Sequence, residues 1–497
     1  MTVLTAFLLA AAIDAVFADL SPGSPGCALA VSRDGVIVYE RGYGTADLEH
    51  GVPITPRTVF DTGSVSKMFT AASVFVLEDQ GRLSLDDSIR KHLPELPGIY
   101  QAVTLRHLIH HTGGVRDYLF LRSLAGHPEL KPVKPREVID LLARQKGLDF
   151  PPGERHSYTN SGYVLLAAVV EKASGQPLSR FAEENLFKPL GMTSTRFFDD
   201  PTRIVLNRAD SYFPSGVFRT WAGTVGDTGL LSTAGDLSRW DMALAKPGQP
   251  GKLRDGTPLG YAGGLFLRDF RGMRTVGHGG STLGYVSDLL SFPEASLTIA
   301  CLCNTPAGAP SRRTREVAAI FLGDRLQPEP PVVPADAPAG LYWDREGDSF
   351  RKVWMKDGKV VLLRFGAERE LAPLGGGRFR IPGTPGTVEV TFGSGFLTET
   401  GDAGLMRFER IEPSAPPDPS GYAGTYRSEE VGGDLSFAVR EGALVLQLGG
   451  QEIPLEPFAQ DGFRHEILGT MRFDPEGFVL NTPRAKGLRY LRRDQSL

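Results

Sequence analysis

The spacing of hydrophobic and polar positions changes several times along the chain. The segment CALAVSRDGVIVYERGYG (27–44) alternates as a half-buried strand does, and Asp34-Gly35 at its centre is typical of a hairpin turn. Residues 297–304, LTIACLCN, form an apolar run that predicts a buried strand. These strands flank a region in which the spacing becomes helical.

Helical spacing begins after Ser64, fills SGYVLLAAVVEKAS (161–174) and returns in TAGDLSRWDMALA (233–245). Thr233 and Asp236 are the two candidate N-caps of that last helix. Early hairpin strands, central helices and late strands near 275–303 favour an α/β sandwich. Its antiparallel sheet should be closed by the two ends of this region.

The opening segment MTVLTAFLLAAAIDAVFADL also shows helical spacing, with apolar residues at Leu4, Phe7, Leu8, Ala11, Ala12 and Val16. A secretory signal is the alternative, but no basic residue precedes Arg33 and two aspartates come early. We therefore expect an amphipathic first helix of the domain itself. No stretch reaches membrane-spanning length, so we expect no membrane partner and a cytoplasmic location, with a periplasmic or secreted one less favoured.

Two proline-rich segments divide the chain. QPEPPVVPADAP (327–338) and EPSAPPDPSG (412–421) favour extended backbone and resist both helix and central strand. They predict three domains: a large α/β domain over 1–326 and two small β domains over 338–412 and 421–497. At 497 residues the chain exceeds what one compact core usually holds, which agrees with this division.

The two small domains are copies of one unit. AGLYWDREGD from Ala339 aligns with AGTYRSEEVG from Ala423, and MKDGKVVL from Met355 with VREGALVL from Val439, both at an offset of 84. An Asp-Gly or Glu-Gly pair lies between apolar runs in each copy, as a two-residue hairpin turn does. Each copy is therefore predicted to be a small, barrel-like antiparallel all-β domain.

Composition and charge exclude some functions. A hydrophobic content of 41% and a net charge of −4 are those of a soluble globular protein without the basic footprint of a nucleic-acid binder. The three cysteines, Cys27, Cys301 and Cys303, are too few for a disulfide framework. Because Cys301 and Cys303 are two apart in a strand, they should share a face, and we interpret all three as core thiols.

Ser64 and Lys67 form the first candidate for chemistry. Residues three apart share a helix face, so the Lys67 amine could take the Ser64 proton as the hydroxyl attacks, provided that the lysine is buried and uncharged. An S-x-x-K pattern by itself is weak, because a serine cap followed by a solvated lysine is the commoner arrangement. Other motifs are needed to support the catalytic interpretation.

Two such motifs follow. Tyr158-Thr159-Asn160 offers a phenol and a carboxamide just before a helix, and His278-Gly279-Gly280 offers an imidazole beside an open backbone. His107, His110 and His111 are also spaced along one predicted helix face, but a structural role is favoured there over a metal site.

The serine–lysine, tyrosine–asparagine and histidine–glycine motifs, in this order, resemble those of the class C β-lactamase-like, penicillin-recognising serine hydrolases. The family's connecting signatures are also present: LRHLIHHTGG (105–114), FPPGERHSYTNSGYVLLAAVVEKASG (150–175) and GDTGLLSTAGDLSRW (226–240). The resemblance covers most of residues 14–322. It implies a β-lactamase/transpeptidase-like fold, an antiparallel sheet with helices, and no cofactor or metal.

Carried over residue by residue, the resemblance implies Ser64 as the acylated nucleophile and Lys67 as its base. Tyr158 would stabilise neutral Lys67 and protonate the leaving group.

Four further residues would bind the substrate. Asn160 would hold its amide, and the N–H groups of Ser64 and Ser281 would form the oxyanion hole beside Gly280. His278 stands where the family's β-lactam and carboxypeptidase members have lysine, and a histidine that titrates near neutrality is a poorer clamp for a carboxylate. Gly279 removes a hydroxyl and opens space.

A β-lactamase-like domain followed by two small β domains is similar to the D-aminopeptidases of this family. An aminopeptidase needs a carboxylate for the substrate's ammonium, and Asp227, Asp288 and the segment FDPEG (473–477) are the candidates. The basic segment LNTPRAKG (480–487) would suit that role badly.

The sequence thus predicts a serine hydrolase of short peptides or amides, most simply a D-stereospecific aminopeptidase. A broad esterase or a weak β-lactamase with the same mechanism is the first alternative. A non-catalytic penicillin-binding or sensor protein is the second. Small peptides, amides or esters are the expected partners, and the sequence leaves open whether the chain forms a homo-oligomer.

Overall fold

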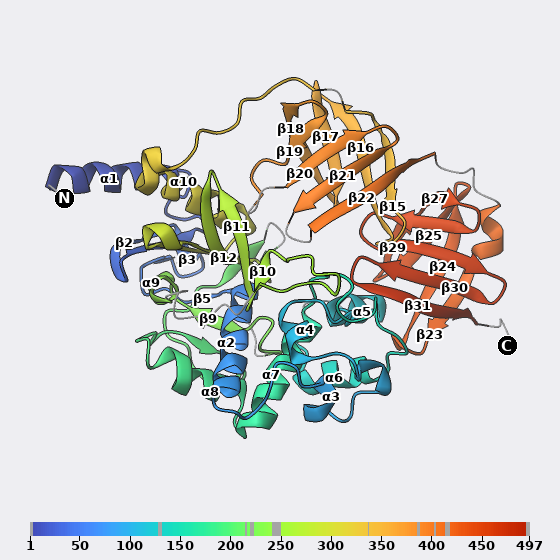
Figure 1. The fold of residues 1–497 in the computed structure, drawn as a ribbon, viewed down its shortest axis with the longest axis horizontal. Helices are drawn as coiled ribbons and strands as arrows, with labels where there is room; N and C mark the ends of the chain where they lie inside the picture. Colours follow the sequence, from blue (N-terminus) through green and yellow to red (C-terminus); the bar gives the residue numbers. More distant parts are fainter. Residues whose placement is uncertain are drawn as a thin grey trace.

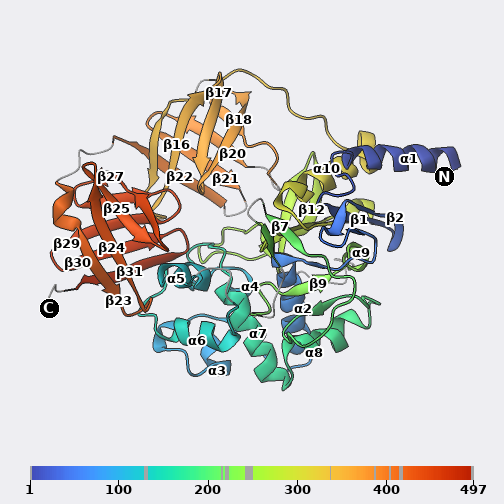
Figure 2. The ribbon, with the colours of Figure 1, turned by 180° about the vertical axis from the view of Figure 1, so that it is seen from behind.

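The computed structural model describes residues 3–127, 132–213, 216–218, 223–240, 250–335, 337–384, 388–401, 404–412 and 418–493, with side chains from residue 7 onward. The first part of the chain forms an α/β sandwich, and the last part forms two β units beside it (Figure 1). The same arrangement seen from behind shows the two β units next to each other (Figure 2). None of the helices within the described residues combines the length and apolar character needed to cross a membrane.

The sandwich contains a seven-stranded antiparallel sheet, closed by the early hairpin as predicted. Its strand order is β10 (Tyr261–Ala262), β11 (Leu265–Phe270), β12 (Met273–Thr282), β13 (Tyr285–Phe292), β14 (Leu297–Cys303), β1 (Cys27–Arg33), β2 (Val36–Tyr43). Asp34 and Gly35 join β1 to β2 with positive φ at both positions, as a tight hairpin requires. β1 lies against β14, although 263 residues, 34–296, separate the end of one from the start of the other.

Both faces of the sheet are buried at its strands β13, β14 and β1, and the alternation of side chains along β1 decides which helices each residue meets. Leu29 and Val31 face α1 (Val3–Val16) and α10 (Pro310–Leu322), whereas Ala28 and Ala30 belong to the core on the opposite face. That core includes α2 (Ser66–Asp79), α7 (Ser161–Ser174) and α9 (Ala234–Arg239). Thr233, and not Asp236, caps α9, since its hydroxyl accepts the Asp236 N–H; residues 241–245 of that predicted helix lie outside the described residues.

Shorter elements complete the sandwich. The remaining helices are α3 (Ile89–His92), α4 (Leu105–Ile109), α5 (Tyr118–Leu124), α6 (Pro135–Ala143) and α8 (Leu178–Ala182). The remaining strands are β3 (Thr45–Asp47), β4 (Val52–Pro53), β5 (Phe60–Asp61), β6 (Arg196–Phe197), β7 (Ser211–Phe213), β8 (Gly216–Phe218) and β9 (Leu230–Ser232).

Helix α1 forms where predicted, but its buried face differs from the one expected. Phe7 and Leu8 are 76% and 64% exposed, whereas Ile13 and Phe17 are buried. Among the described side chains of the helix, Leu9, Ile13 and Val16 belong to or pack against the core that includes α10, and the N-terminal end of the helix projects away from the body (Figure 1). Of the predicted face, only Val16 is packed against the core among the described side chains.

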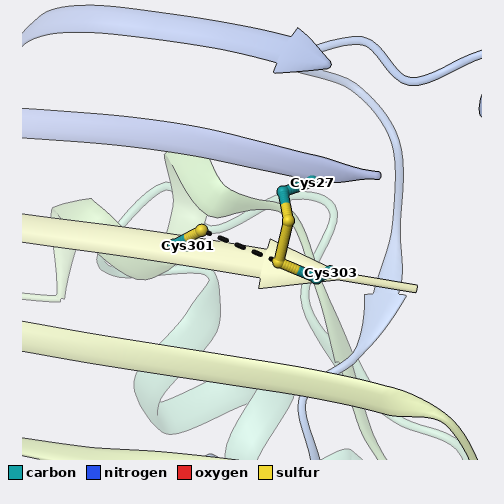
Figure 3. A group of neighbouring side chains, drawn as sticks. All are labelled: Cys27, Cys301 and Cys303. Carbon is teal, nitrogen blue, oxygen red and sulfur yellow. Dashed lines mark hydrogen bonds between the residues drawn. A yellow bond between two sulfur atoms is a disulfide. The ribbon is translucent and has the colours of Figure 1, made fainter. Parts of the chain in front are cut away.

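The cysteines require a second correction. All three are buried, as predicted, but Cys27 and Cys303 form a disulfide, and Cys301 is the free thiol (Figure 3). Cys27 and Cys303 lie directly opposite each other on β1 and β14, a proximity created only by strand pairing between distant segments. The predicted common face of Cys301 and Cys303 is present, with their sulfur atoms 3.8 Å apart.

The two C-terminal units have the predicted antiparallel all-β architecture. The first is a closed barrel of β15 (Gly340–Asp344), β16 (Ser349–Lys356), β17 (Lys359–Arg364), β18 (Ala367–Gly375), β19 (Arg378–Arg380), β20 (Glu389–Gly393), β21 (Phe396–Gly401) and β22 (Gly404–Ile411). The second is a nine-stranded sheet of β23 (Gly424–Ser428), β24 (Gly433–Arg440), β25 (Ala443–Leu448), β26 (Gln451–Pro454), β27 (Glu456–Ala459), β28 (Gly462–His465), β29 (Gly469–Asp474), β30 (Gly477–Thr482) and β31 (Ala485–Arg492).

The strands repeat as the sequence does. Strands β23, β24 and β25 begin 84 residues after β15, β16 and β17, respectively, and from β21 to β30 the shift is 81 residues. A shorter connection before β29 accounts for the difference. The domain boundaries at 326, 338, 412 and 421 stay predictions.

Candidate active site

Ser64 lies on a single 3₁₀ turn, Gly63–Val65, that leads directly into α2. It does not cap the helix: residue 65 is the N-cap, and no side chain makes the capping hydrogen bond. Lys67, one turn further on, is fully buried, and its Nζ lies 3.1 Å from Ser64 Oγ. The arrangement of a serine cap beside a solvated lysine is therefore absent here.

Two further acceptors hold the Lys67 amine. Nζ lies 2.8 Å from Asn160 Oδ1 and 2.8 Å from the carbonyl oxygen of Asp227. Amide and carbonyl oxygens can only accept hydrogen bonds, whereas a serine hydroxyl can also donate. A neutral amine has two N–H groups for these oxygens and a lone pair left for the Ser64 hydroxyl, so the geometry suits a lysine that acts as a base.

Asp117, which the sequence analysis missed, orients Asn160. It is buried at the start of α5, and its Oδ2 accepts hydrogen bonds from the Asn160 backbone N–H at 2.7 Å and from Nδ2 at 3.1 Å. This fixes the carboxamide so that Oδ1 faces Lys67, and it leaves one Nδ2 hydrogen for a substrate.

Tyr158 lies in the coil before α7 with its ring against the lysine. The centroid of the Tyr158 ring is 4.9 Å from Lys67 Nζ, and the centroids of the Tyr158 and His111 rings are 4.3 Å apart. The Tyr158 hydroxyl is buried and has no hydrogen-bond partner among the described residues. A buried hydroxyl without a partner is costly, so this group is available to a substrate atom.

Strand β12 brings the predicted histidine–glycine motif beside the turn that carries Ser64. A Cβ atom added at Gly280 would lie 1.9 Å from the Thr62 carbonyl oxygen, and one added at Gly63 would lie 2.7 Å from the Ser281 backbone nitrogen. The Ser287 hydroxyl donates to the same Thr62 oxygen at 2.7 Å. Only glycine allows this close approach, which brings the Ser281 backbone next to the Ser64 turn.

His278 differs from the histidine expected from the sequence. Its side chain is buried, and burial together with the nearby Lys67 lowers its pKa to about 3. It is therefore neutral, and does not titrate near neutrality. Its ring lies 4.9 Å from the Phe266 ring, and its Nε2 has no partner among the described residues.

Of the three predicted sites for a substrate ammonium, only Asp227 lines the cleft. Asp288 accepts hydrogen bonds from Ser311 and Thr314 and does not line the cleft. Asp474, in the segment 473–477, pairs with Arg489 and likewise lies outside the cleft lining. Asp227 remains: burial raises its pKa, and it lines the cleft.

The Asp227 carboxylate is only half satisfied. Oδ2 accepts a hydrogen bond from the Tyr118 hydroxyl at 2.9 Å, and Oδ1 has no partner among the described residues. Burial also raises the pKa of Asp61, another carboxylate of the cleft, to about 7; that side chain already accepts the Gly63 N–H. Asp227 Oδ1 is therefore a buried carboxylate oxygen of the cleft that a donor could fill.

All three parts of the chain line the cleft, whose volume is about 1780 Å³. The first barrel contributes Trp343 and Arg345, and the second unit contributes Arg484 from the β30–β31 connection and Lys486 from β31. The basic segment 480–487 thus reaches the active site, whereas the acidic segment 473–477 does not. The sequence offered no signal for this choice between neighbouring segments.

The histidines of the segment 105–114, His107, His110 and His111, do not form a cluster of possible metal ligands within the described part of the chain. Among the described residues, such clusters are formed by the three cysteines and by Asp47, Glu49 and His50. Two of the cysteines are already joined in the disulfide. The His107 ring instead contacts Thr104 at the start of α4, and the His111 ring accepts the Thr159 N–H.

Comparison with known proteins agrees with this fold. The Beta-lactamase family model matches residues 11–323, and the chain belongs to that family. Penicillin-binding protein 4* of Bacillus subtilis is 31% identical over 309 residues, which cover 55% of this chain and 66% of that protein. A D-aminopeptidase of Cereibacter sphaeroides is 27% identical over 442 residues, 84% of this chain and 82% of that protein.

A solved structure shares the fold over most of the chain. The octameric penicillin-binding protein homologue from Pyrococcus abyssi has a TM-score of 0.56 and 25% identity, and the match covers 80% of this chain and 98% of that one.

Proposed function

We propose that this chain is a serine hydrolase that acylates Ser64 with short peptides or amides bearing an amino-terminal D-residue. One observation carries the proposal: a buried lysine nitrogen lies 3.1 Å from a serine hydroxyl, between two oxygens that can only accept hydrogen bonds. Relatives named D-aminopeptidase that align with 84% of this chain support the substrate class.

In the proposed reaction, Ser64 Oγ attacks the substrate carbonyl carbon while its proton passes to Lys67 Nζ. The proton then moves through the Tyr158 hydroxyl to the leaving nitrogen as the carbon–nitrogen bond breaks. Water reverses these steps and releases the acid. The backbone N–H groups of Ser64 and Ser281 would bind the oxyanion, and no metal or cofactor takes part.

Asp227 is the proposed partner of the substrate ammonium. The α-nitrogen of an aminoacyl group is only three bonds from Ser64 Oγ, so its partner must lie near Lys67. The Asp227 carbonyl oxygen contacts Lys67 directly, and its carboxylate has one oxygen without a partner among the described residues. A bound ammonium would satisfy that oxygen and compensate its charge.

A substrate panel tests the proposal. D-alanine p-nitroanilide, its L-enantiomer, short-chain p-nitrophenyl esters and a chromogenic cephalosporin are given to the wild type and to Ser64→Ala. We expect hydrolysis of the D-anilide that Ser64→Ala abolishes. Hydrolysis of esters alone would favour the esterase, cephalosporin turnover the weak β-lactamase, and activity unaffected by Ser64→Ala would refute the mechanism.

A non-catalytic penicillin-binding or sensor protein remains the second alternative. Labelling of Ser64 by a fluorophosphonate or a β-lactam, without turnover of any amide or ester, would favour it over the hydrolase.

The predicted cytoplasmic location also stays a proposal, and the Cys27–Cys303 disulfide makes it testable. Structural disulfides are rare in reducing compartments. Cell fractionation combined with alkylation of free thiols would decide it.

A further inference from the structure

The cleft contains a permanent cation that the sequence analysis did not expect. Arg484, on the connection between β30 and β31, places its guanidinium carbon 5.3 Å from the centroid of the Tyr158 ring. An arginine keeps its charge at all pH values of interest. Because His278 is neutral, the fixed positive charge beside the Tyr158 ring comes from Arg484.

Arg484 is not neutralised by a neighbouring acid. Its guanidinium makes no ion pair or hydrogen bond with any described residue, although it lines the cleft. Two other arginines of the cleft are already paired: Arg345 lies 3.1 Å from Glu409, and Arg155 lies 3.0 Å from Glu346. An unpaired guanidinium beside a catalytic tyrosine is therefore available to an anion.

The backbone around Arg484 is fixed on both sides. Its carbonyl oxygen accepts the Asp117 N–H at 2.8 Å, and the Lys486 N–H donates to Asp149 Oδ1 at 2.6 Å. The unit itself is anchored by a buried ion pair, Arg116 with Glu430, at 2.6 Å. The arginine side chain thus starts from a rigid attachment point next to the residue that orients Asn160, which lowers the entropy cost of binding.

We propose that Arg484 binds the free carboxylate of the substrate's leaving group. This inference rests on the proposed function, in which Tyr158 protonates the leaving nitrogen. In a dipeptide, the terminal carboxylate is two bonds from that nitrogen, so a leaving group at the Tyr158 hydroxyl brings its carboxylate towards the guanidinium stacked on the ring. The ammonium would lie at the other end, at Asp227.

The preferred substrate is therefore a zwitterionic dipeptide and not an amino-acid amide. Asp227 selects its amino end and Arg484 its carboxyl end, and the distance between them limits the length of the peptide. Charge-assisted hydrogen bonds of this kind, formed in a partly buried site, give discrimination of about 10- to 100-fold.

Two matched substrates test this preference. The acyl group that reacts fastest in the panel above is joined to glycine or to glycinamide, so that only the carboxylate differs. We expect the wild type to prefer the glycine substrate by at least about tenfold in kcat/KM. Arg484→Gln should remove that preference by raising KM for the glycine substrate alone, and Arg484→Lys should restore part of it.

Arg345→Gln is the matched control, because this cleft arginine is already paired with Glu409. It should leave the preference unchanged. An equal preference in the wild type and in Arg484→Gln, with both substrates still hydrolysed, would overturn the proposal for Arg484 and leave the proposed function intact.

A binding experiment tests the carboxylate site at Arg484 even if the protein does not hydrolyse these peptides, so the failure of this proposal can be distinguished from the failure of the proposed function. Titration calorimetry measures the affinity of two proteins, Ser64→Ala and Ser64→Ala combined with Arg484→Gln, for the glycine peptide and for the glycinamide peptide. Neither protein can be acylated, so both peptides stay uncleaved. Tighter binding of the glycine peptide that depends on Arg484 supports the carboxylate site even if the wild type hydrolyses neither peptide. Equal affinities in all four combinations would overturn it.

Discussion

Gly280→Ala should disable acylation although it adds a single methyl group. The new Cβ would lie 1.9 Å from the Thr62 carbonyl oxygen and 2.4 Å from Ser287 Oγ. Carbon and oxygen atoms do not approach this closely, so β12 and the turn that carries Ser64 must separate by about 1 Å or more. The Ser287–Thr62 hydrogen bond, which joins these two segments, would be disturbed by the same movement.

That displacement separates the Ser281 backbone from Ser64, the two groups proposed to hold the oxyanion. A misplacement of about 1 Å in a catalytic site can cost about 100-fold in rate, which corresponds to about 2.7 kcal/mol of transition-state stabilisation. We therefore expect kcat/KM to fall by about two orders of magnitude, with a smaller effect on substrate binding.

Gly279→Ala is the control, because its neighbour on the same strand has room. A Cβ at Gly279 would meet its nearest atom, Ser287 O, at 3.5 Å, which is an ordinary contact. The assay is the rate of Ser64 labelling by a fluorophosphonate, together with kcat/KM for the D-anilide and the melting temperature. Similar acylation rates in the two variants, with both folded, would refute the close-approach argument.

Three further predictions follow from the same geometry. Asp117→Asn should lower kcat by about tenfold with little change in KM, because an amide cannot accept hydrogen bonds at both of its ends; single-turnover acylation measures this. The pKa of His278 is about 3 in the folded protein and about 6.5 in the unfolded chain, so between these pH values only the unfolded chain binds the proton. The free energy of unfolding should therefore decrease as the pH is lowered below 6.5, by about 2 kcal/mol at pH 5, and urea titrations of His278→Asn should not show this decrease. In denaturant without reductant, thiol labelling should find one free cysteine per chain, Cys301, and three after reduction.

Much of the site could be predicted because its parts are marked by short motifs. Ser64 and Lys67 are one helical turn apart, so the helix after Ser64 brings them together. Tyr158, Asn160 and His278 lie around the same lysine in the structure, as their motifs indicated. Their catalytic roles stay proposals.

Other parts of the site carried no such mark. Asp117 could have been recognised as the N-cap of α5, but the sequence gives no sign that its second oxygen holds Asn160. The Asp227 carbonyl oxygen acts through the backbone, which any residue possesses. Arg484 was set aside because its basic segment did not suit an ammonium, whereas the structure brings that segment into the cleft.

The sequence by itself determined the elements and the repeat. Periodicity and turn residues depend on neighbours a few positions apart, which is why the hairpin at Asp34-Gly35 and the helix Ser161–Ser174 form where predicted. Tertiary structure alone decided the contacts between distant segments: Cys27 with Cys303, Lys67 with Asp227, and Arg484 with Tyr158. Such contacts depend on how the sheet closes and how the last β unit docks, and no local pattern encodes either.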